Sequence, residues 1–147
     1  MIMDRESLTL LLKRNGLFVT NPRLQVLDIL SEENGPISIE NIVSRSENGL
    51  ALSTLYRVVA DLLDVKLVKT FSAPDQKLMV ELSDDQDEHH HHLYCESCEK
   101  VFDIDLDNEL EVMITSLIEK IGETHGIEIT DHSFEMYGQC NTPGKHL

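Results

Sequence analysis

The stretch HHHHLYCESC, from His89 to Cys98, constrains this chain more than any other feature. Four consecutive histidines lead into a Cys-x-x-Cys motif. In an extended strand, successive side chains point to opposite faces. His89 and His91 would then face one way, and His90 and His92 the other. One metal site cannot readily use all four imidazoles, whereas two sites can use two each. The segment is therefore either a polar loop or a strand flanked by two metal sites, and the second reading is favoured.

Each pair of histidines needs further ligands from elsewhere in the chain. The obvious suppliers are three carboxylates and one histidine, namely Glu81, Asp103, Glu111 and His132. Two imidazoles with a carboxylate suit Zn²⁺, Fe²⁺ or Mn²⁺, and the ligand types leave the choice of metal open.

Cys95 and Cys98 have the spacing of two thiolates on one zinc ion. A thioredoxin-type redox pair would need a helix opening at the first cysteine, and the residues that follow do not predict one. Cys140 is a natural third ligand. The fourth is not apparent from the sequence, although His146 is close enough to be a candidate.

Charge divides the chain near residue 80. Residues 1–80 carry nine Lys/Arg and ten Asp/Glu, whereas residues 81–147 carry three and 17, and also hold all seven histidines and all three cysteines. The acidic half is suited to binding cations. DNA binding depends instead on local Lys and Arg, because phosphates need positive partners. We expect two domains, residues 1–82 and 83–147.

The first domain has the periodicity of short helices. Predicted helices cover residues 6–16, 20–35, 38–49 and 53–65, with Thr20 or Asn21, Ser38 and Ser53 as caps. In the last helix, the apolar spacing predicts a buried stripe of Leu55, Val58, Val59, Leu62 and Leu63, with Thr54, Tyr56, Arg57 and Asp61 outside it. Two short strands around residues 73–75 complete a pattern that resembles a winged helix-turn-helix, although a small helical bundle with no special role is the alternative.

Scattered basic residues of this domain could supply phosphate contacts: Lys13, Arg14, Arg23, Arg57, Lys66 and Lys69.

In the second domain, we expect strands on both sides of the Cys turn and a helix that ends at Gly126. Its apolar stripe is Leu110, Ile114, Leu117, Ile118 and Ile121. A further strand is predicted within residues 127–140. The expected fold class is therefore α+β.

The chain has no stretch of roughly 20 apolar residues and no signal-peptide layout at its start, so a cytoplasmic protein without membrane contact is expected.

Three segments carry a family resemblance: GLFVTNPRLQVLDIL, STLYRVV and HHHHLYCESCEKVFDI. They resemble the ferric uptake regulator (Fur) family of bacterial metal-dependent repressors, and HGIEITDHSFEMYGQC matches its C-terminal strands. The resemblance covers residues 7–140. It implies an N-terminal winged-helix domain, a C-terminal α/β dimerisation domain, and a homodimer that binds palindromic double-stranded DNA operators when loaded with metal.

The resemblance also implies roles for individual residues. Tyr56 and Arg57 match recognition-helix residues that touch DNA, and Thr54 is a further DNA-binding candidate beside them. The regulatory metal site matches Glu81, His90, His92 and Asp103. A second site matches His89, His91, Glu111 and His132, and the structural zinc site matches Cys95, Cys98 and Cys140.

The chain departs from the family pattern at three points. Pro36 stands near the position where relatives often place a hinge histidine, and a proline side chain cannot bind metal. No fourth cysteine follows Cys140. The helix after Asp107 is about one turn longer than usual, which leaves Glu109 and Glu111 as alternatives at the second site.

The sequence thus predicts a metal-responsive repressor that senses Fe²⁺, with a zinc or manganese sensor of the same family as the alternative. A metal-buffering protein would explain the second domain but would leave the first without a purpose. A metalloenzyme is disfavoured because no nucleophile–base arrangement is present, and we expect no small-molecule substrate other than metal ions.

Overall fold

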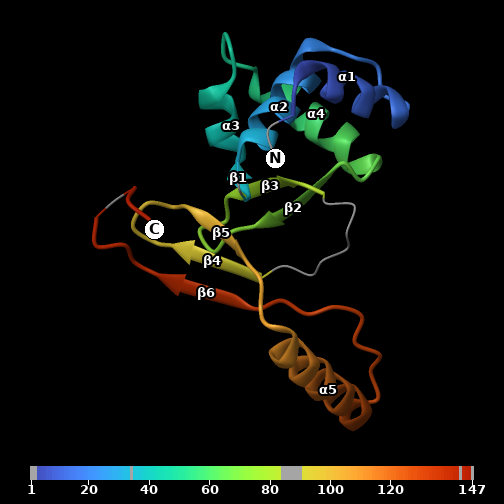
Figure 1. Cartoon of the computed structure of the whole chain (residues 1–147), viewed down its shortest axis with the longest axis vertical. Coiled ribbons are helices and arrows are strands. Elements are labelled where there is room, and N and C mark those ends of the chain that lie inside the picture. The colour runs from blue at the N-terminus through green and yellow to red at the C-terminus, as the bar shows by residue number, and fades with distance from the viewer. Residues whose placement is uncertain (1–2, 34, 84–90, 143, 147) are drawn as a thin grey trace. The chain divides into compact units, whose positions relative to one another are not determined.

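The computed structural model describes residues 3–33, 35–83, 91–142 and 144–146 (Figure 1). The chain divides into two compact units, residues 1–87 and 88–147. Each contains a three-stranded sheet together with one or more helices, so the fold class is α+β as predicted.

The first unit has four helices followed by a β-hairpin. The helices are α1 (Arg5–Arg14), α2 (Asn21–Glu32), α3 (Ile39–Arg45) and α4 (Leu52–Asp64). The hairpin pairs β2 (Val68–Ser72) with β3 (Leu78–Leu82), and the short strand β1 (Ile37–Ser38) pairs with the other edge of β3. This arrangement is the winged helix that the sequence predicted, with β1 as an addition too short to be recognised from the sequence.

The predicted cap residue is correct for α3 and wrong for α4. The Ser38 side chain accepts a hydrogen bond of 3.2 Å from the backbone N–H of Asn41, as expected of a cap. The prediction of Ser53 as the cap of α4 is wrong. The Leu55 N–H donates to the Ala51 carbonyl at 3.0 Å, so the first turn begins ahead of Ser53.

One hydrophobic core joins α1 to α4 and the hairpin. Leu55, Val58, Val59 and Leu62 of α4 are buried in it, as predicted. Leu63 is not: it is 37% exposed, because it lies about 100° around the helix from Leu62, at the edge of the stripe. The buried stripe fixes which face of α4 is left on the surface.

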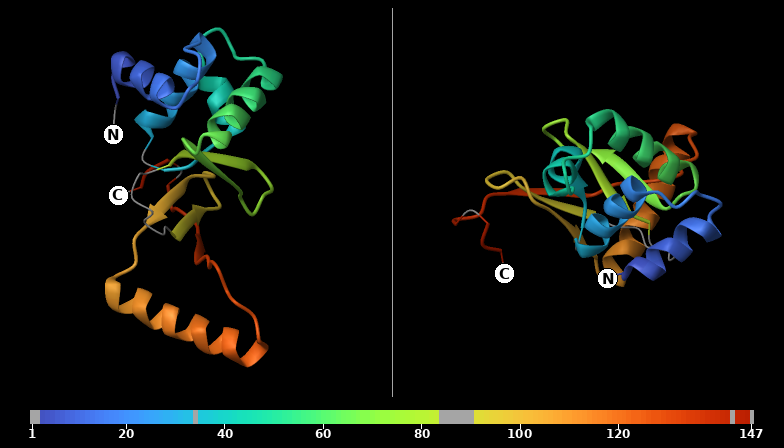
Figure 2. Two further views of the ribbon diagram at one scale, coloured as in Figure 1. Left: turned by 90° about the vertical axis from the view of Figure 1, so that its right-hand side faces the viewer. Right: turned by 90° about the horizontal axis from the view of Figure 1, so that it is seen from above.

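The second unit is built on a sheet with strand order β5-β4-β6 (Figures 1 and 2). The central strand β4 (His91–Cys95) is antiparallel to β5 (Val101–Ile104) and parallel to β6 (Glu135–Gly138). The expected strand within residues 127–140 is thus confined to β6.

Helix α5 (Asn108–His125) provides the crossover between β5 and β6. Its first turn is capped by Asp107, which accepts from the Leu110 N–H at 2.8 Å, and Gly126 ends it with a φ of 64°. The helix extends away from the sheet of its own unit and buries none of its residues. Of its apolar stripe, Leu110, Leu117 and Ile121 therefore stay exposed to solvent among the described residues.

Among the described residues, no helix combines the length and the apolar character needed to span a bilayer.

Two adjacent leucines of α4 test the core assignment. Leu62 is fully buried and Leu63 is 37% exposed. We expect Leu62→Ala to lower the free energy of unfolding by about 2–5 kcal/mol, because a cavity is left in a closed core. Leu63→Ala serves as the matched control and should cost much less. Urea unfolding followed by circular dichroism measures both, and equal losses would contradict the assigned stripe.

Candidate metal centres and nucleic-acid interface

The central strand β4 presents His91 and His92 to different surroundings. His91 is fully buried and lies opposite Ile104 in the β5 register, whereas His92 lies opposite Asp103. The side chain of His92 is 15% exposed. Since the two residues are adjacent in a strand, their side chains project from opposite faces of the sheet. The alternation argued from the sequence therefore holds for these two histidines.

Three donor groups converge on the His91 face. The Nε2 atom of His91 lies 2.6 Å from Oε1 of Glu111, and Nε2 of His132 lies 3.8 Å from Oε2 of the same carboxylate. The His91 and His132 ring centroids are 5.7 Å apart, and Phe134 packs edge-on against His91. Two imidazoles and a carboxylate fit Zn²⁺, Fe²⁺ or Mn²⁺.

This convergence favours Glu111 over Glu109, the two carboxylates that the sequence left open. Glu111 lies in the first turn of α5 and contacts both histidines, whereas Glu109 is exposed. The three residues come from a strand, a helix and the segment before β6.

On the other face, His92 and Asp103 form a cross-strand pair. The Nε2 atom of His92 lies 3.7 Å from Oδ1 of Asp103. Glu81, which the resemblance places with them, belongs to β3 of the first unit. His89 and His90 lie outside the described residues, so their assignment to the two sites stays a prediction.

The third group gathers the three cysteines and the C-terminal histidine. Donor atoms of Cys95, Cys98, Cys140 and His146 all lie within 4.8 Å of one another. The Nε2 atom of His146 is 2.9 Å from the sulfur of Cys98, and its ring packs edge-on against Phe102 with centroids 4.9 Å apart. Three thiolates and one imidazole are a donor set of structural zinc sites. The structure thus brings His146, the candidate that the sequence offered, beside the three cysteines as a possible fourth donor.

Neighbouring thiols set the charge of this group. Burial raises the pKa of Cys95, but hydrogen bonds from the backbone and thiol of Cys98 and from the thiol of Cys140 outweigh it and lower the pKa to about 6. Burial raises the pKa of Cys140, and its contacts with Cys95 and Cys98 raise it further. The lowered pKa of Cys95 favours its thiolate, the form that binds metal.

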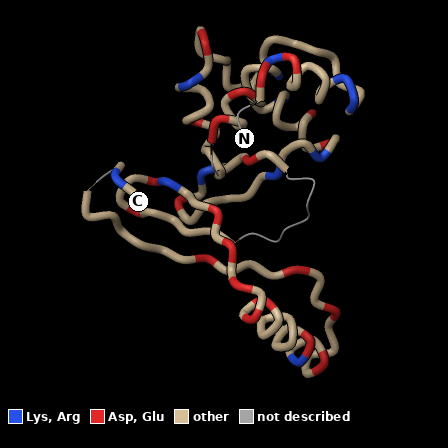
Figure 3. Tube along the Cα trace, in the orientation of Figure 1, with Lys and Arg blue, Asp and Glu red and all other residues tan. Residues whose placement is uncertain are grey.

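In the first unit, the exposed side of α4 carries the residues predicted to touch DNA. Tyr56 is 47% exposed, Arg57 is exposed and Thr54 is half-buried. Lys13 and Arg14 are exposed at the end of α1. Positive and negative residues are interspersed along the trace of this unit (Figure 3). The candidate DNA-binding face is therefore defined by the exposed residues of α4.

Arg23 differs from the other predicted DNA contacts. Its side chain is 15% exposed, and its guanidinium donates to the Phe18 carbonyl at 2.7 Å and to the Asp61 carboxylate at 2.6 Å. No local sequence pattern indicates this pairing, since Asp61 lies 38 residues further along the chain.

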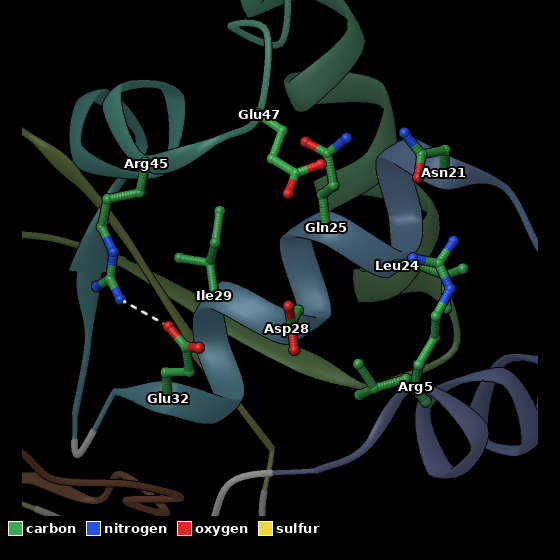
Figure 4. A pocket seen from close by; sticks show the side chains of 10 residues that line it. Arg5, Asn21, Leu24, Gln25, Asp28, Ile29, Glu32, Arg45 and Glu47 are labelled. Carbon is green, nitrogen blue, oxygen red and sulfur yellow. Dashed lines mark hydrogen bonds and ion pairs between the residues drawn. The ribbon is translucent and has the colours of Figure 1, made fainter.

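A cavity of about 240 Å³ lies beside α2 (Figure 4). Its wall mixes the cations Arg5 and Arg45 with the carboxylates Asp28, Glu32 and Glu47. None of the residues that the sequence singled out for metal or DNA lines it.

A winged-helix unit with an exposed helix, joined to a unit with clustered metal donors, defines the class of metal-dependent transcription regulators. Residues 14–137 match the Ferric uptake regulator family, and the chain belongs to that family. Its members are transcriptional regulators that bind DNA and are not enzymes.

Individual relatives agree with this assignment. The chain is 35% identical over 133 residues to the ferric uptake regulation protein of Escherichia coli K12. The matched region covers 88% of this chain and 85% of that protein. The crystal structure of the Vibrio cholerae ferric uptake regulator is 31% identical with a TM-score of 0.69, and covers 90% of this chain and 98% of that one. The structure of a zinc-bound manganese uptake regulator is 26% identical in sequence and has a TM-score of 0.72. This match also covers 90% of this chain and 98% of the other chain.

His146 offers a direct test of the third donor group. We expect His146→Ala to weaken zinc binding at least about tenfold, since losing even an outer-shell partner has that effect. The affinity is measured by competition with a chromophoric chelator. His125→Ala, in the same unit but at the exposed end of α5, is the control and should leave the affinity unchanged. Unaltered zinc affinity in His146→Ala would exclude the histidine as a ligand.

Proposed function

We propose that this protein is a transcriptional repressor that senses Fe²⁺ and binds palindromic operators as a homodimer when metal is bound. The observation that carries the proposal is the convergence of His91, Glu111 and His132 in a chain of this family. A buried histidine next to a carboxylate and a second histidine suits a metal site better than a structural role.

The regulatory site is proposed to consist of Glu81, His90, His92 and Asp103. The His92–Asp103 pair supports it, because both residues lie on one face of the second unit's sheet. Pro36 offers no ligand, so Glu81 is the proposed contribution from the first unit. Residues of two units that hold the same ion restrict the angle between those units.

Such a restriction is what a metal-dependent repressor needs. Two recognition helices of a dimer match two half-sites about one DNA turn apart only when their separation is fixed. Metal shifts the population of this state only by binding it more tightly than the others. Tyr56, Arg57 and Thr54 are proposed to reach base edges, with Lys13 and Arg14 on phosphates.

The choice of Fe²⁺ rests on ligand type and on the relatives. Imidazole and carboxylate ligands suit Fe²⁺, and relatives named ferric uptake regulation protein match most of this chain. Zn²⁺ and Mn²⁺ suit the same ligands, and a sensor of either metal is the alternative. The group of Cys95, Cys98, Cys140 and His146 is proposed as the structural zinc site, and His89, His91, Glu111 and His132 as the second site.

The dimer is proposed to form through α5. Exposed apolar side chains follow its length, including Leu110 (39%), Met113 (68%), Leu117 (56%) and Ile121 (42%). They lie on one side of the helix at helical spacing. An uncovered apolar stripe of this length is typical of a protein–protein interface, and a second copy of the chain presents a matching one.

A charge placed in this stripe tests the dimer. We expect Leu117→Asp to give monomers in sedimentation velocity, because a carboxylate would be buried against apolar side chains. Ser116→Asp, one position away and off the stripe, is the control and should remain dimeric. Dimers in both variants would place the interface elsewhere.

Separate substitutions on the two faces of β4 test the proposed switch. We expect His91→Ala and His92→Ala each to lose about one equivalent of metal, as measured by mass spectrometry of the purified protein. Only His92→Ala should abolish operator binding in a gel shift, because it removes a regulatory ligand. Identical effects would argue against two separate sites. Equal binding by metal-stripped and metal-loaded unmodified protein would remove the metal switch altogether and leave metal buffering as the better reading.

A further inference from the structure

Arg23 is held inside the first unit at both ends of its guanidinium. It donates through Nη1 to the Phe18 carbonyl at 2.7 Å and through Nη2 to Oδ2 of Asp61 at 2.6 Å. Its side chain is 15% exposed, against 43% for that of Asp61. The planar fork of an arginine binds two acceptors in fixed directions. With both ends engaged, little of this cation is available to a phosphate.

Asp61 occupies a sensitive position on α4. It follows Arg57 by four residues, so the two side chains are neighbours on the helix surface. Arg57 is exposed, and no ion pair of Arg57 is found within the described parts of the chain. A carboxylate at this spacing attracts a neighbouring guanidinium, and it also repels DNA phosphates.

We propose that Arg23 is a positioning residue for DNA binding and not a phosphate contact. By pairing with Asp61 it neutralises the carboxylate beside Arg57 and leaves Arg57 available to DNA. Through Phe18 it also ties the segment between α1 and α2 to the recognition helix. This inference rests on the proposed function, and it replaces the sequence-based expectation that Arg23 contacts phosphate.

The two roles of Arg23 predict opposite outcomes for a second substitution. Arg23→Gln removes the cation and releases Asp61, so DNA binding weakens in either case. If Arg23 acts through Asp61, adding Asp61→Asn removes the harmful charge and restores binding. If Arg23 contacts phosphate, the second substitution restores nothing, because the lost cation is still missing.

The experiment uses the full-length protein loaded with Mn²⁺, chosen because it resists oxidation by air. The probe is a fluorescent duplex that the unmodified protein has selected from random-sequence DNA. Dissociation constants are measured over a range of salt concentrations. We expect Arg23→Gln to bind about tenfold more weakly, in the range for partial loss of an arginine contact. The double variant should return to nearly the unmodified affinity, with an unchanged salt slope.

A phosphate contact would leave a different signature. The double variant would stay weak, and its salt slope would be lower by about 0.9 for each lost contact, or about 1.8 for a dimer. That result, or unchanged affinity in Arg23→Gln, overturns the inference while the proposed function stands. Failure of the unmodified protein to bind any duplex overturns the function itself.

Two further variants control for folding and for the loss of an ion pair as such. Arg45 lies in the same unit, at the end of α3. It pairs with Glu32 at 3.1 Å (Figure 4) and also with Glu33. Arg45→Gln should leave DNA affinity unchanged. Arg23→Lys keeps a cation that can pair with Asp61, and it should bind DNA better than Arg23→Gln. Should Arg23→Gln fail to fold, the comparison passes to Arg23→Met, which keeps an unbranched apolar stem but no cation, with and without Asp61→Asn. A gain from Asp61→Asn on that background supports the inference, and no gain refutes it.

Discussion

The alternation of side chains along β4 is the constraint on which the second unit depends. Because adjacent residues of a strand face opposite ways, His91 and His92 cannot share one metal ion without distorting the strand. Each face then collects its own partners. The register with β5 places Asp103 opposite His92, and the crossover through α5 brings Glu111 to His91. One short strand thereby separates two donor groups that are adjacent in sequence.

The acidity of residues 81–147 has a physical counterpart in these groups. Carboxylates placed close together repel one another, and part of that cost is offset when they share a cation. The same reasoning explains the separate chemistry of the cysteine group. There, burial raises the pKa of Cys140 and hydrogen bonds with the other two thiols raise it further, while hydrogen bonds within the same group lower the pKa of Cys95. A metal ion would remove this conflict, since bound thiols are deprotonated.

The first unit depends on a different principle, the burial of one side of α4. Leu55, Val58, Val59 and Leu62 fix the rotation of the helix, so the side with Tyr56 and Arg57 has to face outward. Exposure alone does not make a residue available to DNA, because charged neighbours compete for it. The ion pair of Arg23 with Asp61 engages the carboxylate that would otherwise compete with DNA for Arg57. A contact within the domain thereby affects which side chains on its surface are available to DNA.

The sequence by itself determined much of this protein. Helical spacing gave the four helices and the buried stripe of α4, and strand alternation separated His91 from His92, because both depend only on backbone periodicity. The spacing of Cys95 and Cys98 likewise indicated a shared ligand role. Tertiary structure alone decided which distant residues meet: Glu111 instead of Glu109, His146 beside Cys98, and Asp61 with Arg23. These pairs are separated by 20, 48 and 38 residues, and no local pattern encodes where the chain returns. Such contacts arise from packing of the whole domain. Sequence periodicity therefore indicates which residues are candidate partners, but it does not indicate which of them meet.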